Sequence, residues 1–280
     1  MSTTTGAETE RAATACMASL VASLADNKAA LGRRYGEWAV SAPTLESAVA
    51  AAAMAQDELG HARATYPVLA KLGVVRAEDS MDTSGALPFI SAELPDWAAM
   101  IAANLVVDGI LTTWAASVRD SSIEPLAQRA RKILQEEGAH KVHAEAWARR
   151  ICRAGGADRD LLLRRIGEAW HDAARWPGRD DDPGYREAVA AGMASVGPRA
   201  IREQVRSWLD DLLSKEGCAV PLPEPYLDCP FCASTDVEEV SQWGGQIITR
   251  QVRCRACNTY FEAVRDDFDD APHAASSEPK

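Results

Sequence analysis

Apolar and polar positions follow one pattern before about residue 217 and a different one after it. The first part consists of long runs rich in Ala, Leu, Arg and Glu, which favour α-helix. Turn and capping residues between these runs predict helices over about 8–40, 44–72, 96–119, 123–153, 158–176 and 184–215. The first four are longer than most helices of globular proteins, which predicts a bundle about 30 Å tall.

The second part contains prolines, paired cysteines and short stretches of β-branched and aromatic residues. We therefore expect four parts: an all-helical bundle over 8–215, a Pro-containing linker over 216–227, a small metal-bound β module over 228–265 and an acidic disordered tail over 266–280. Within the β module, Glu238–Val240 and Gln246–Val252 are the expected strands.

The charge balance excludes several functions. The 280 residues include 30 Lys and Arg against 41 Asp and Glu, a formal charge of −11, which argues against nucleic-acid binding and against adsorption to an anionic membrane. The uncharged run near Trp97–Val107 is too short to span a bilayer. The first residues, MSTTTGAETERAATA, lack a basic segment followed by an apolar one, so we expect no signal peptide and a cytoplasmic protein.

Two predicted helices carry the same motif, an acid followed by Glu-x-x-His. Residues three apart lie on one face of a helix, so Glu58 and His61 can bind one metal ion, and Glu137 and His140 another. A single Glu-x-x-His is usually a surface pair. Two copies 79 residues apart instead fit a bundle that binds two metal ions with one further carboxylate from each of the other two helices.

The other two long helices each offer one acid in apolar surroundings, Glu37 and Asp108. Asp108 is the only charged residue between Trp97 and Val118, and a buried carboxylate is costly to ionise unless a cation meets it. Both acids are therefore candidate ligands. The alternatives are a cap or ion pair with a neighbouring arginine for Glu37, and a hydrogen-bonded buried acid for Asp108.

Asp57 and Glu136 directly precede the two candidate glutamate ligands. They point about 100° away from these ligands around their helices. They are either solvated or accept hydrogen bonds from the ligand histidines of the opposite half, which would fix the imidazole rings. Carboxylate and imidazole ligands of this kind suit iron and leave exchangeable positions, so the sequence predicts a centre of two iron ions.

These residues resemble a known family. The strings RRYGEWAVSAPTLESAVAAAAMAQDELGHAR, LVVDG and EEGAHKVH are similar to the ferritin-like oxygenase subunits of the phenylacetyl-CoA epoxidase system. The resemblance implies a ferritin-like four-helix bundle with extra C-terminal helices and a di-iron monooxygenase subunit. It also implies O₂ and an aromatic acyl-CoA as substrates, a separate reductase or ferredoxin, and a related helical subunit or a second copy as partner. Glu37, Glu58, His61, Asp108, Glu137 and His140 match the metal-holding pattern.

Four of the seven cysteines form two Cys-x-x-Cys pairs separated by 21 residues. The odd total argues against a disulfide framework, and two converging thiolate pairs are typical of a zinc ribbon. The expected ligands of one structural zinc ion are Cys229, Cys232, Cys254 and Cys257. The segment also resembles the C-terminal ribbon of an accessory maturation protein of the same epoxidase system, and its fusion to an oxygenase-like bundle departs from the usual subunit arrangement.

Two other functions compete with an oxygenase. A rubrerythrin-like peroxide reductase also joins a di-iron bundle to a four-cysteine module, but its iron-binding knuckles favour Gly where this chain has Ala233 and Asn258. A non-catalytic assembly subunit is the other alternative, with the ribbon as its docking module. The metal content separates these functions: two irons and one zinc, three irons, or zinc alone.

Overall fold

The computed structural model describes residues 3–74, 83–232, 234, 236–246 and 248–264. The chain divides into two compact units, Met1–Pro225 and Tyr226–Lys280, and each is described by itself. The expected acidic tail, 266–280, lies outside the described residues.

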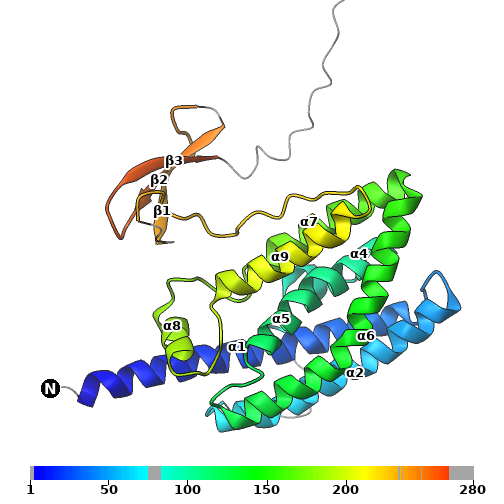
Figure 1. The fold of residues 1–280 in the computed structure, drawn as a ribbon, viewed down its shortest axis with the longest axis horizontal. Coiled ribbons are helices and arrows are strands. Elements are labelled where there is room, and N and C mark those ends of the chain that lie inside the picture. Colours follow the sequence, from blue (N-terminus) through cyan, green and yellow to red (C-terminus); the bar gives the residue numbers. More distant parts are fainter. Residues whose placement is uncertain (1–2, 75–82, 233, 235, 247, 265–280) are drawn as a thin grey trace, which may run out of the picture. The chain divides into compact units, whose positions relative to one another are not determined.

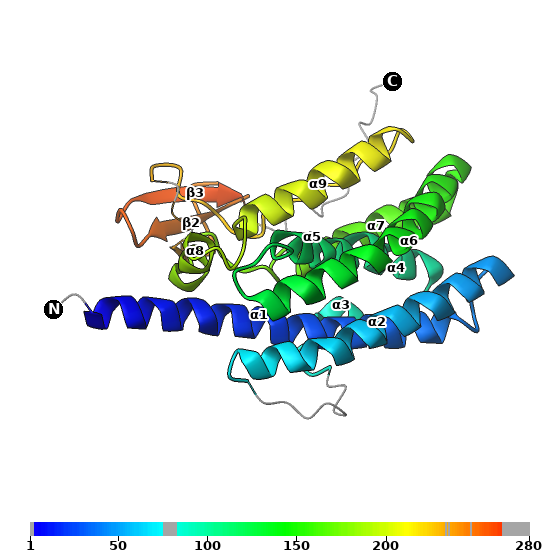
Figure 2. The same ribbon diagram turned by 60° about the horizontal axis from the view of Figure 1, so that its bottom comes forward.

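The first unit is a helical bundle, which confirms the predicted fold class (Figures 1 and 2). Its helical elements are α1 (Thr3–Trp38), α2 (Leu45–Lys71), α3 (Pro88–Ser91), α4 (Trp97–Ala102), the π-helical segment η1 (Ala103–Asp108), α5 (Gly109–Ser117), α6 (Glu124–Ala154), α7 (Gly156–Ala173), α8 (Pro183–Ala190) and α9 (Pro198–Ser214). Helix α1 lies beside α2, and α6 packs against both α2 and α5. Helix α9 packs on α5 and α6.

Helix α1 buries one stripe of side chains spaced alternately four and three residues apart. The apolar members of this stripe, all buried, are Met17, Val21, Leu24, Leu31 and Tyr35. This spacing keeps one face of a long helix against its neighbours. The position of the stripe between Leu24 and Leu31 is taken by Lys28, which is also fully buried.

The ends of α2 follow the capping signals in the sequence. The Thr44 hydroxyl accepts a hydrogen bond from the Ser47 amide at 3.2 Å, as an N-cap side chain does. At the other end, Gly73 has φ +80°, a left-handed conformation that glycine adopts readily and that often ends helices. The two ends place Glu58 and His61 in the middle of the helix.

The third long helix is interrupted by η1, which the capping and breaking residues of the sequence do not predict. The Asp96 side chain caps α4 by accepting a hydrogen bond from the Ala99 amide at 2.8 Å, and η1 ends at Asp108. π-Helical turns inside α-helices are frequent at functional sites. The run Trp97–Ser117 is long and apolar enough for a membrane span by composition, but 83% of its 18-residue apolar window is buried inside the protein, as expected of a core helix.

The single helix expected over 184–215 is wrong, because the structure has two helices there. Helix α8 ends at Ala190, and Gly192 follows with φ +69°. Helix α9 begins at Pro198, whose ring suits the first turn of a helix but not its interior. Glycine and proline therefore divide this segment.

The second unit contains an antiparallel sheet of order β1-β2-β3. Its strands are β1 (Val237–Ser241), β2 (Thr249–Cys254) and β3 (Tyr260–Val264). The first two correspond to the expected strands, although β2 begins three residues later than expected, whereas β3 was not predicted. Val252 of β2 and Ala263 of β3 are buried, so a small sheet with the cysteines at its end forms this unit.

Candidate metal centre

Carboxylates and imidazoles converge in the core of the bundle. Glu58 comes from α2, Asp108 from the last position of η1, and Glu137 and His140 from one turn of α6. All four are buried, and each offers a ligand atom within 4.8 Å of the others'. His61, one turn after Glu58, is also buried, and its Nδ1 lies 3.4 Å from Glu137 Oε1. The two Glu-x-x-His motifs and the η1 aspartate therefore meet at one place.

The two histidines are oriented by carboxylates from the opposite helix. His61 Nε2 lies 2.7 Å from Glu136 Oε2, and His140 Nε2 lies 3.3 Å from Asp57 Oδ2. The ring edge of Tyr35 packs against His140, with ring centroids 6.4 Å apart. The Nε2 atoms are thus held by the protein, which directs the Nδ1 atoms into the cluster.

Several polar atoms inside the cluster lack hydrogen-bond partners. Within the described part of the chain, His61 Nδ1, His140 Nδ1 and Glu58 Oε2 are buried and none has a hydrogen bond of good geometry, although carboxylate oxygens lie 3.0–3.5 Å from His140 Nδ1. A buried polar atom without a partner is rare and needs an explanation. Lone pairs of two imidazoles and a carboxylate are what an iron ion uses, so the cluster fits a di-iron centre.

A buried lysine also lies among these carboxylates, and the Glu-x-x-His motifs do not reveal it. The Lys28 ammonium is 3.0 Å from Glu58 Oε1, 2.6 Å from Asp108 Oδ1 and 2.5 Å from Glu137 Oε1. The side chain is fully buried. Helix α1 therefore contributes a lysine to the cluster, whereas α2, η1 and α6 contribute acids.

The charges of the cluster depend on one another. Burial raises the pKa of Glu58 to about 7, although the Lys28 ammonium opposes this shift. Burial would lower the pKa of Lys28, but the carboxylates of Asp108, Glu137 and Glu58 hold it well above its ordinary value. Burial would raise the pKa of Glu137, but Lys28 and the His140 ring hold it well below its usual range. The cluster therefore favours cations in its interior.

The structure does not bring Glu37 to this cluster, in disagreement with its expected role as a ligand. Its side chain is 45% exposed and pairs with Arg34 at 3.0 Å, which was the alternative interpretation. The physical reason is its position two residues after Tyr35, the last member of the buried stripe, so it faces about 200° away around the helix.

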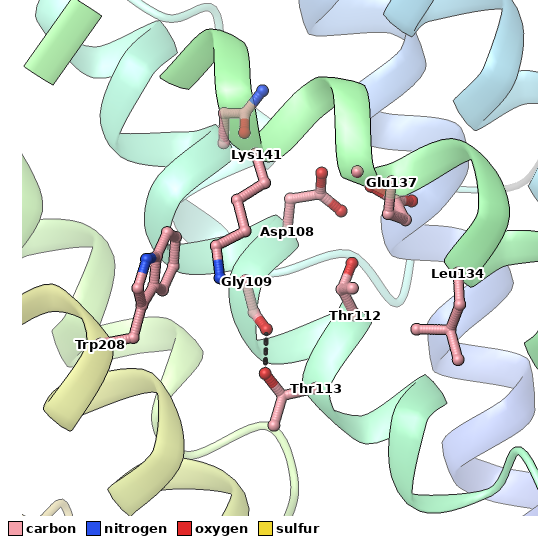
Figure 3. A pocket seen from close by; sticks show the side chains of 10 residues that line it. Asp108, Gly109, Thr112, Thr113, Leu134, Glu137, Lys141 and Trp208 are labelled. Atoms are coloured by element: carbon pink, nitrogen blue, oxygen red, sulfur yellow. Dashed lines mark hydrogen bonds between the residues drawn. The ribbon is translucent and has the colours of Figure 1, made fainter. Parts of the chain in front are cut away.

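A cavity of about 200 Å³ leads to the cluster between η1, α5, α6 and α9. Asp108 and Glu137 line it and face each other across its inner part (Figure 3). Lys141 and Trp208 line another part of the wall, with the ammonium 4.3 Å from the centroid of the indole ring. The cavity gives a small molecule access to two of the clustered carboxylates.

The close packing of Trp208 beside the cavity leaves little room for a side chain at Gly109 on α5. A Cβ atom at Gly109 would lie 3.1 Å from the Trp208 ring, tighter than ordinary van der Waals contact. The indole N–H donates to Glu145 Oε1 at 2.8 Å, which fixes the ring from its other side. Trp208 is thus a packed and hydrogen-bonded part of the cavity wall.

The four cysteines of the second unit form a separate cluster. The Sγ atoms of Cys229 and Cys257 lie 3.6 Å apart, as do those of Cys232 and Cys254. These distances exclude disulfides, in which sulfurs are about 2.05 Å apart. Four thiolates bound to one zinc ion at about 2.3 Å would have their sulfurs roughly 3.8 Å apart. The cluster therefore fits a structural zinc ion, as predicted.

A helical bundle with two Glu-x-x-His pairs and a further buried acid is the architecture of ferritin-like carboxylate proteins. The family model of the phenylacetic acid catabolic protein matches residues 1–228, and the chain belongs to this family. The PaaD zinc beta ribbon domain matches residues 219–265. Both matches confirm the resemblance found in the sequence. No curated protein sequence matches the chain. The family implies an oxygenase-like catabolic subunit.

Proposed function

We propose that the protein is a cytoplasmic, O₂-dependent di-iron monooxygenase subunit that acts on an organic substrate, such as an aromatic acyl-CoA. The observation that carries this proposal is the cavity that connects Asp108 and Glu137 to Lys141 and Trp208. A buried metal centre without access would suit a structural role. A centre reached by a cavity suits the binding of a small molecule next to the metal.

The residues of this chain have distinct tasks in the proposal. Two iron ions would be held by Glu58, His61, Asp108, Glu137 and His140, and when bound they would supply the electrons that reduce O₂. Asp57 and Glu136 hold the imidazole rings through Nε2, which keeps Nδ1 available to bind a metal ion. The fully buried apolar residues of η1, such as Leu105, Val106 and Val107, exclude water from the centre.

The size of the cavity supports an aryl group as the reacting part of the substrate. A protein cavity of roughly 150 Å³ accepts benzene, so about 200 Å³ suffices for a substituted ring. A CoA carrier would have to extend out of the cavity past its rim. Lys141 is exposed at this wall and offers a cation for an anionic group of the carrier. Electrons would come from a separate reductase or ferredoxin, and a related helical subunit or a second copy would complete the enzyme.

Lys28 favours a second candidate, a non-catalytic subunit that stabilises a catalytic partner. An ammonium among three carboxylates can balance their charge without a metal, as a scaffold would need. The rubrerythrin-like alternative has less support, because the cysteine module matches a zinc ribbon.

The proposal is tested by the reaction of the iron-loaded, chemically reduced protein with O₂. With a reductase and an aromatic acyl-CoA supplied, we expect O₂ uptake coupled to an oxygenated product. Asp108→Asn keeps the side-chain size but removes a charge from the centre, so we expect at least about a tenfold slower O₂ reaction, equivalent to roughly 1.4 kcal/mol of barrier.

Asp120→Asn, at an exposed acid beyond α5, is the matched control and should react like the wild type. Unchanged kinetics in Asp108→Asn would remove Asp108 from the ligand set. A wild type that binds iron but does not react with O₂ would favour the non-catalytic subunit.

A further inference from the structure

Lys28 occupies a position that a metal ligand of the first helix would serve. In di-iron bundles, two helices supply Glu-x-x-His and each of the other two supplies a carboxylate. Here α2 and α6 carry the motifs and η1 carries Asp108. Among the described residues, α1 sends Lys28 into the cluster instead of an acid. This substitution exchanges a negative ligand for a positive charge.

The ammonium group is saturated by the same atoms that a metal would use. A lysine ammonium has three N–H donors, and Lys28 meets one oxygen from each of three carboxylates, those of Glu58, Asp108 and Glu137. The other oxygens of Asp108 and Glu137 lie 3.5 and 3.0 Å from His140 Nδ1. An oxygen lone pair that accepts a short hydrogen bond from the ammonium is not available to a metal ion.

Because Lys28 is buried, removing it would leave the three carboxylates without a counter-ion and would lower the stability of the fold. Removing one partner from a buried ion cluster leaves an uncompensated charge and strongly destabilises the fold. Three buried carboxylates without any cation would be unstable. On α1, Lys28 lies between Leu24 and Leu31, which are both buried. The cluster therefore needs a cation, and it can take either the ammonium or a metal.

We propose that Lys28 is an internal counter-ion that competes with iron for Glu58, Asp108 and Glu137. It stabilises the ligand cluster before loading and lowers the affinity of the centre for iron. Loading then requires the ammonium to release at least part of these carboxylate oxygens. This inference rests on the proposed iron centre and adds a residue that controls metal loading.

The test compares the wild type with Lys28→Met, which removes the charge and keeps the length of the side chain. The iron(II) dissociation constant is measured by anaerobic competition with a chromophoric chelator. We expect Lys28→Met to bind iron(II) at least about tenfold more tightly, because the competing cation is gone. Lys71→Met, at an exposed position in the last turn of α2, is the control and should bind like the wild type.

A second readout is the melting temperature of the helical signal after chelator treatment. Lys28→Met should melt roughly 5–10 °C below the wild type and gain more from added iron(II). If Lys28→Met folds only with iron(II) present, that result also supports the competition. Lys28→Gln, which keeps a hydrogen-bond donor, should show the same changes to a smaller extent.

Equal iron affinities in the wild type and Lys28→Met would overturn the inference. A lower melting temperature with unchanged affinity would also overturn it, because Lys28 would then be a structural partner only. If both proteins bind iron equally, the proposed centre survives. If neither binds iron, the proposed function and this inference fail together.

Discussion

A Cys229→Ser protein is expected to lose its zinc and the structure of its ribbon while the helical bundle stays folded. Cys229 is buried and supplies one of four clustered thiolates. A sheet of three short strands with few buried residues has little core of its own, and small metal modules draw much of their folding free energy from the ion. Zinc analysis and limited proteolysis should show release of the ion and cleavage within 228–264, while circular dichroism keeps its helical signal.

Cys152→Ser is the matched control, because Cys152 is a buried cysteine of α6 outside the thiolate cluster. It should retain the zinc and the protease resistance of the ribbon. If Cys229→Ser instead loses most of its helical signal, the bundle depends on the ribbon and the two units do not fold separately.

The second large effect is expected from Glu137→Gln. Glu137 touches Lys28, lies 3.0 Å from His140 Nδ1 and lines the cavity, so its carboxylate is central to the proposed iron centre. An amide of the same size is a much poorer iron ligand. We expect iron content to fall by at least half and the affinity that remains to fall about 100-fold, with helicity unchanged because Glu58 and Asp108 still pair with Lys28.

Two further substitutions on α6 are the comparisons for Glu137→Gln. Glu136→Gln changes the carboxylate that holds His61 through Nε2, so we expect a smaller loss of about tenfold in affinity. Glu124→Gln, at an exposed acid in the first turn of α6, should leave iron binding unchanged. Wild-type iron content in Glu137→Gln would show that Glu137 is not a ligand.

Most of the helical architecture could be predicted from the sequence because capping and breaking residues act locally. Thr44 and Gly73 mark the ends of α2 by their own conformations, and Asp96 marks the start of α4. The π-helical segment could not be predicted in this way, because no capping or breaking residue within Ala103–Asp108 marks it. Strand β3 was missed because the sheet is held by pairing between strands and by the thiolate cluster.

The centre was only partly predictable for a related reason. The repeated Glu-x-x-His fixes which residues share a helix face, but it does not say which residue of α1 points at them. Glu37 is an acid of α1 in apolar surroundings and was therefore predicted as a ligand, but it faces away from the cluster. Lys28 had a detectable signal, since it is a charged residue in the middle of a stripe of large apolar side chains. A cation at such a position indicates buried anions on the neighbouring helices.

The metal content of the full chain decides whether the bundle holds a di-iron centre. The purified protein is incubated anaerobically with excess iron(II), freed of weakly bound metal and analysed for iron and zinc together with its optical spectrum. We expect about two irons and one zinc per chain, given a bundle with two Glu-x-x-His pairs and one four-thiolate cluster. Zinc alone, with no iron retained at saturating iron(II), would contradict it.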